Sequence, residues 1–84
     1  MIRVRCLGHI GTALGATQID LDETEIDASE IVERLRSRVS GESGFSKYNT
    51  LVMVEDGEAF VPASVERKVK SGERVVLIPF SHGG

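Results

Sequence analysis

The sequence is poor in cysteine, proline and aromatic residues, and each scarcity excludes a class of protein. Among its 84 residues are one cysteine, two prolines and no tryptophan, and aromatic residues make up 5%. Because a lone cysteine, Cys6, cannot close an intramolecular disulfide, a disulfide-stabilised secreted scaffold is excluded and a reducing cytoplasm is expected. No segment has the low complexity of a linker or the period of a repeat protein.

A strong charge of one sign and long apolar runs are also missing. Ten Lys and Arg against 13 Asp and Glu give a formal net charge of −3, whereas nucleic acid binding needs a basic field. No run approaches the roughly 20 apolar residues of a membrane span. Arg3 and Arg5 interrupt the segment that a signal peptide would keep apolar. We therefore expect a soluble cytoplasmic protein whose partners include neither nucleic acid nor a membrane.

The 40% of hydrophobic residues is enough for one globular domain. We assign it to residues 1–80, with a flexible tail at 81–84. A domain of this size buries only about 60% of the surface that its unfolded chain exposes, so its core is modest. Because such a core leaves no room for a large substrate-enclosing cavity, the size argues against a self-contained enzyme with a buried active site.

The hydrophobic pattern predicts strands near both ends of the domain with a helix between them. Apolar and polar residues alternate over 2–6 and again over 16–21, which predicts two strands joined as a hairpin through a glycine-containing loop. Residues 28–40 carry apolar side chains at helical spacing, Asp27 stands at the capping position, and Glu30 follows as in a capping box. Three more strands are predicted over 51–54, 58–61 and 75–78.

This order of elements predicts an α+β fold, with one main helix at about 28–40 packed on one face of a mixed sheet of four or five strands. The continuous apolar run over 75–78 is typical of a central strand that is buried by its neighbours. Residues 22–25 are expected to form an acidic loop, and residues 63–70 a polar, irregular segment.

Two patterns near the N-terminus resemble ligand sites but have structural explanations. The glycines at positions 8, 11 and 15 suggest a phosphate loop, but the Lys-Ser/Thr pair and the following helix of a P-loop are missing, so a flexible hairpin loop is expected. Cys6 and His9 have a metal-ligand spacing, but a structural zinc site needs four ligands. Because Cys6 shares a strand face with Ile2 and Val4, we expect a buried core thiol and no metal site.

The tail Ser81-His82-Gly83-Gly84 carries the most distinctive chemistry of the sequence. Four extended residues reach about 13 Å, and two glycines without Cβ atoms form a strip of backbone thin enough for a narrow channel in another protein. The Gly84 carboxylate becomes reactive as an acyl-adenylate, which a sulfur or amine nucleophile can attack. No residue of this chain is expected to catalyse that step, so a partner must bind ATP and Mg²⁺. The alternative is a frayed end without a function.

Ser81 and His82 are adjacent, but they are not expected to act as a nucleophile and its base. Side chains of neighbouring residues in an extended chain point in opposite directions. We expect both residues to belong to the part of the tail that enters a partner.

Two groups of residues are candidates for docking that partner. A basic cluster before the last predicted strand could steer an acidic partner to the tail, or it is simply a solvated face. It comprises Arg67, Lys68, Lys70 and Arg74. The second group is aromatic: if Phe60 or Phe80 is exposed together with Leu7 on the open face of the sheet, that patch becomes the partner site.

Residues 70–84 resemble the C-terminus of the β-grasp sulfur carriers. In this chain, Gly72-Glu73-Arg74-Val75 is followed by apolar residues and then by Pro79-Phe80, where typical carriers have a double proline. His82 and the two glycines complete the segment. The family includes the small subunit of molybdopterin synthase, the thiamine-pathway carrier, the ubiquitin-related modifiers and the small archaeal modifier proteins. His82 is similar to the ending of the ubiquitin-related modifiers.

The resemblance implies a ubiquitin-like β-grasp fold and a function for Gly84. It implies that a ubiquitin-activating-like adenylyltransferase, which binds ATP and Mg²⁺, adenylates Gly84 and that a thiocarboxylate then forms there. The acceptor of the sulfur would be the large subunit of molybdopterin synthase or another sulfur-accepting enzyme. Alternatively, Gly84 is joined to lysines of target proteins, as in a protein modifier. A non-covalent β-grasp interaction domain is the third hypothesis.

Overall fold

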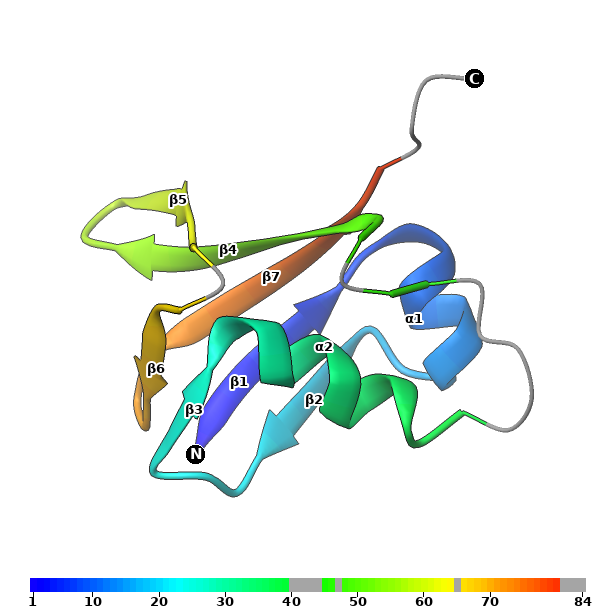
Figure 1. The fold of residues 1–84 in the computed structure, drawn as a ribbon, viewed down its shortest axis with the longest axis horizontal. Helices are drawn as coiled ribbons and strands as arrows, with labels where there is room; N and C mark the ends of the chain where they lie inside the picture. The colour runs from blue at the N-terminus through cyan, green and yellow to red at the C-terminus, as the bar shows by residue number, and fades with distance from the viewer. Residues whose placement is uncertain (40–44, 47, 65, 81–84) are drawn as a thin grey trace.

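The main sheet has five strands in the order β2-β1-β7-β4-β5 (Figure 1). The structure is a computed structural model that describes residues 1–39, 45–46, 48–64 and 66–80. β1 and β7 are parallel and the other pairs are antiparallel, so the sheet is mixed, as the sequence predicts. The strands are β1 (Ile2–Cys6), β2 (Gln18–Leu21), β4 (Thr50–Asp56), β5 (Ala59–Pro62) and β7 (Arg74–Pro79).

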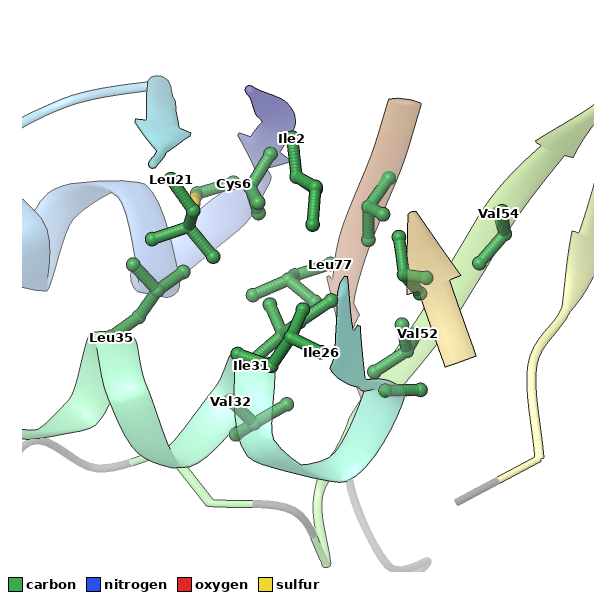
Figure 2. Packing of buried hydrophobic residues seen from close by; sticks show 14 of the residues in the cluster. Ile2, Cys6, Leu21, Ile26, Ile31, Val32, Leu35, Val52, Val54 and Leu77 are labelled. Carbon is green, nitrogen blue, oxygen red and sulfur yellow. The ribbon is translucent and has the colours of Figure 1, made fainter. Parts of the chain in front are cut away.

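One face of this sheet is covered by α2 (Ala28–Arg36), which confirms the predicted main helix and with it the α+β, β-grasp architecture (Figure 1). Ile31 and Leu35 of the helix are fully buried against the inward side chains of the strands, among them Leu77 of β7 (Figure 2). The alternation of β1 places Cys6 on the same buried face, which confirms the predicted core thiol. Burial raises the pKa of this thiol, which disfavours the reactive thiolate form.

α2 begins at Ala28, as predicted, but its capping contact and its C-terminal end differ from the prediction. Asp27 stands at the N-cap position, but its side chain makes no capping hydrogen bond and instead pairs with Lys68 Nζ, 2.5 Å from Asp27 Oδ1. The helix ends at Arg36, and residues 37–39 form turns, so the predicted end at 40 was too late. The apolar face of α2 therefore ends with Leu35, and Val39 packs against the core from beyond the helix.

A second helix, α1 (Gly8–Leu14), stands where the sequence predicts a glycine loop. Glycine disfavours helices by propensity, but here tertiary packing outweighs propensity, because Ile10 is fully buried in the core. Gly11 permits the close approach of α1: a Cβ at this position would lie 2.8 Å from the carbonyl oxygen of Cys6. Gly15, with φ 72°, then ends the helix in the left-handed conformation that glycine adopts readily.

Two further strands, β3 (Glu25–Asp27) and β6 (Lys68–Lys70), form a separate antiparallel pair. They correct only the ends of the loops predicted at 22–25 and 63–70, since residues 22–24 lie outside any helix or strand, as predicted. Each contributes one buried apolar residue, Ile26 or Val69, to the core. Three residues are too few to show the alternation by which strands are predicted from sequence.

No helix in the described part of the chain is long and apolar enough to cross a membrane.

Candidate functional site

The tail begins at the end of the central strand, β7. β1 runs parallel to β7, and β4 runs antiparallel to it. The C-terminal end of β1 and the N-terminal end of β4 therefore lie beside the C-terminal end of β7 (Figure 1). The backbone N–H of Leu7 donates to the carbonyl of Leu77 at 3.1 Å, and that of Phe80 donates to the carbonyl of Asn49 at 2.9 Å. The last described residue is therefore fixed to the body of the protein. Residues 81–84, which include all four predicted tail residues, lie outside the described residues.

The face of the sheet opposite α2 carries an apolar surface that leads to this point. On this open face Leu51 is paired with Ile78 and Met53 with Val76, in register across β4 and β7. Phe60 of β5 stands opposite Glu55 at the outer side of the same face. We define the open-face patch as these residues together with Leu7, which follows β1, and Phe80, which follows β7. The patch comprises Leu7, Leu51, Met53, Phe60, Val76, Ile78 and Phe80.

The aromatic residues proposed for docking belong to this patch. Phe60 is 41% exposed, Phe80 44% and Leu7 36%, so all three have the exposure that the sequence prediction requires of a docking residue. Apolar side chains left exposed on one contiguous face favour a role in binding another protein. Their function in docking stays a prediction.

The basic cluster is not a uniform cationic surface. Arg67 pairs with Glu73 at 2.9 Å, Lys68 with Asp27 at 2.5 Å, and Arg74 with Glu55 at 2.9 Å. A hydrogen bond from Lys68 to Asp27 and the charge of that carboxylate raise the pKa of Lys68.

Of the four cluster residues, only Lys70 has an exposed side chain without an ion pair among the described residues. The cluster is also divided in space, because Arg74 lies on β7 of the main sheet and Lys68 and Lys70 lie on β6. Docking through these residues stays a prediction, with most of their charge already balanced.

Glu73 organises the turn that leads into β7, and it gives a pH-dependent contribution to stability. Its carboxylate accepts hydrogen bonds from the Arg67 guanidinium at 2.9 Å and from the Lys70 backbone N–H at 2.7 Å. These bonds, that from Arg67 foremost, hold the pKa of Glu73 below its ordinary value of 4.5. Because the pKa is lower in the folded than in the unfolded chain, the contribution is present above pH 4.5 and is lost as the pH falls through the folded-state pKa.

We expect Glu73→Gln to flatten the decrease in melting temperature that the wild type shows as the pH falls below 4.5. Melting curves of both proteins, recorded at a series of pH values, measure how the melting temperature depends on pH. Glu58→Gln is the control, because Glu58 is exposed and has no ion pair among the described residues. Equal slopes for the two variants would contradict the assignment.

The other patterns noted in the sequence do not assemble into a site in the described part of the chain. His9 is exposed on α1, whereas Cys6 is buried beneath it. Within the described residues, no three His, Cys, Asp or Glu side chains are grouped so that they could hold a metal ion.

Comparison with solved structures shows where this fold occurs. SAMP1, small archaeal modifier protein 1 from Haloferax volcanii, has a TM-score of 0.69 and 14% identity, over 99% of this chain and 98% of that chain. Molybdopterin converting factor subunit 1 from Pyrococcus furiosus has a TM-score of 0.66 and 18% identity, over 95% and 97%. A chain of the BexX/CysO complex from Amycolatopsis orientalis has a TM-score of 0.64 and 19% identity, over 100% of both chains.

At these identities the likeness establishes the fold, and it extends over nearly the whole length of each protein. No protein-family model matches the sequence, and no curated protein matches it either. The β-grasp fold is thus established by structure, where sequence comparison alone is silent.

Proposed function

We propose that this chain is a ubiquitin-like sulfur carrier that acts through the carboxylate of Gly84 and is not itself a catalyst. The observation that carries the proposal is that Gly83-Gly84 follows a central β-grasp strand after three intervening residues, and that the end of this strand is fixed beside an exposed apolar face. The solved structures with the same fold include a molybdopterin converting factor subunit and a small archaeal modifier, which supports a carrier or modifier over an enzyme.

The chemistry requires a partner for both steps. A Gly84 oxygen attacks the α-phosphate of ATP, pyrophosphate leaves, and an acyl-adenylate forms. Hydrosulfide released by a sulfur donor then attacks the acyl carbon, the bond between the acyl carbon and the phosphate oxygen breaks, AMP leaves, and loss of the S–H proton to solvent leaves the thiocarboxylate. ATP and Mg²⁺ would be held by a ubiquitin-activating-like adenylyltransferase, while this chain supplies the acyl group and a surface for docking.

The docking surface we assign is the open-face patch. A partner that covers the patch excludes water from apolar side chains next to the tail and orients the tail at the same time. The large subunit of molybdopterin synthase, or another sulfur acceptor, would need the same access to Gly84 in the second half of the cycle.

Mass spectrometry tests the proposal directly. After incubation with the adenylyltransferase of its own organism, ATP, Mg²⁺ and a sulfur donor, the intact protein should show one exchange of oxygen for sulfur, located in the C-terminal peptide. The same incubation without ATP is the control. Failure of the exchange with every adenylyltransferase of this type in that organism would reject the sulfur-carrier function.

A protein modifier is the second candidate, favoured by the likeness to small archaeal modifier protein 1. In that case a lysine amine attacks the adenylated Gly84 and an amide forms. Conjugates that resist reducing agent and carry the Gly83-Gly84 remnant on a lysine would identify this function. The two roles share the adenylation step, so one protein is able to perform both.

A further inference from the structure

A shallow hollow of about 220 Å³ lies on the open face, over the first half of β7 and therefore away from the tail. Val76 of the open-face patch lies in its lining, and Phe60 borders it on the β5 side. Three arginines also line it: Arg3 and Arg5 of β1 and Arg74 of β7. The hollow is thus continuous with the apolar surface that we assign to docking.

Two of the three arginines already have carboxylate partners. Arg3 Nε lies 3.4 Å from Asp20 Oδ1 across β1 and β2. Arg74 is held by both oxygens of Glu55, at 2.9 Å from Nε and 3.2 Å from Nη2. The first of these pairs follows from the register, since Arg3 and Asp20 are directly paired residues of neighbouring strands.

Arg5 is the exception. Its cross-strand neighbours are Gln18 on β2 and Val76 on β7, neither of which offers a carboxylate. Among the described residues it forms no ion pair and no side-chain hydrogen bond. Of the charged residues in the lining, three arginines face one carboxylate, that of Glu55, so the hollow is positive.

An unpaired guanidinium beside an apolar surface constrains whatever covers that surface. A partner that packs on the open-face patch removes water from Arg5, and a desolvated charge without a counter-charge opposes binding. A carboxylate offsets this cost best, because its two oxygens match the planar fork of the guanidinium. The hollow has room for such a side chain beside Val76.

We propose that the hollow receives an Asp or Glu side chain of the protein that docks on the open-face patch, and that Arg5 pairs with this carboxylate and so selects the partner. The inference rests on the proposed function in one respect: the docking protein is the ubiquitin-activating-like adenylyltransferase. Arg5 is here a specificity residue, separate from the chemistry at Gly84.

The test compares Arg5→Glu with Arg38→Glu. Both variants make the same change of charge, but Arg38 is exposed just after α2, in the layer opposite the open face. Affinity for the purified adenylyltransferase is measured by calorimetry without ATP, so that binding does not depend on acyl transfer. We expect Arg5→Glu to weaken binding about 30-fold or more and Arg38→Glu less than about threefold. Equal effects would reduce Arg5 to general electrostatic steering and overturn the proposal.

Further measurements exclude other occupants of the hollow. NMR titration of the Arg5 side chain with inorganic phosphate and with N-acetylglutamate should show no stronger binding of phosphate; tighter phosphate binding would indicate a site for free anions and overturn the proposal. Sedimentation should show the same oligomeric state for the wild type and Arg5→Glu, because a homodimer lost in the variant would make a second copy the occupant.

The outcome for Arg5 is distinguishable from the outcome for the proposed function. Adenylation of the wild type together with equal affinities of the two glutamate variants rejects only the role of Arg5. An Arg5-dependent affinity without any adenylation of Gly84 rejects only the carrier chemistry.

Discussion

Removal of Gly83 and Gly84 is expected to abolish adenylation by the ubiquitin-activating-like partner, with a decrease of more than about 1,000-fold in ATP–pyrophosphate exchange. The deletion moves the terminal carboxylate back by two residues, about 7 Å along an extended chain. A displacement of about 1 Å in a reacting group already costs roughly 100-fold in rate. His82 would then be the terminal residue, and its imidazole would stand where the wild type has bare backbone.

We expect this deletion to leave the stability of the folded domain unchanged. The buried residues of the core lie between Ile2 and Leu77, so the melting temperature of the shortened protein should match that of the wild type. Ser81→Ala keeps the length of the tail and both glycines, so its adenylation rate shows how much of any loss comes from a tail side chain rather than from the displaced carboxylate. A shortened protein that retains its biological function would contradict the carrier and the modifier alike and would support a non-covalent interaction domain.

The main architecture was predictable because its signals are local and long enough to be periodic. The alternation in β1 identifies both the strand and its buried face, including Cys6. The apolar positions of α2 likewise mark one face of a helix. α1 was missed because its glycines at positions 8, 11 and 15 are typical of loops. Its helical conformation depends on the packing of Ile10 and on contact with the backbone at Cys6, neither of which a local pattern contains.

The sequence predicts the C-terminal diglycine of the candidate site, but it does not predict which charged residues near the docking surface have a counter-charge. The diglycine is visible in the sequence, and strand alternation places Arg3 and Arg5 on the same side of β1. Which of the two has a counter-charge depends on the register with β2, which gives Arg3 an aspartate and Arg5 a glutamine. The same holds for Lys68, whose partner Asp27 is brought close by the pairing of β3 with β6.

Adjacent residues of β7 should separate stability from binding, because their side chains point to opposite faces of the sheet. Leu77 is fully buried beneath α2, whereas Ile78 lies partly exposed on the open face opposite Leu51. We expect Leu77→Ala to lower the free energy of unfolding by about 2–5 kcal/mol, since it leaves a cavity in the core. Ile78→Ala should cost less stability but weaken binding of the adenylyltransferase about 10-fold, as expected if Ile78 is one of the few central interface residues whose truncation costs more than about 1 kcal/mol.

Urea unfolding measures the first effect, and calorimetric titration of the partner, at a temperature where both variants are folded, measures the second. The informative result is that Leu77→Ala loses mainly stability whereas Ile78→Ala loses mainly affinity for the partner. If Ile78→Ala bound the partner as tightly as the wild type, the open-face patch would not be the docking surface, whatever the chemistry of Gly84. If Leu77→Ala weakened binding as much as Ile78→Ala while still folded, the loss would reflect a disturbed sheet rather than a removed contact. Only a binding defect confined to the open side of β7 ties the exposed apolar face to presentation of the tail.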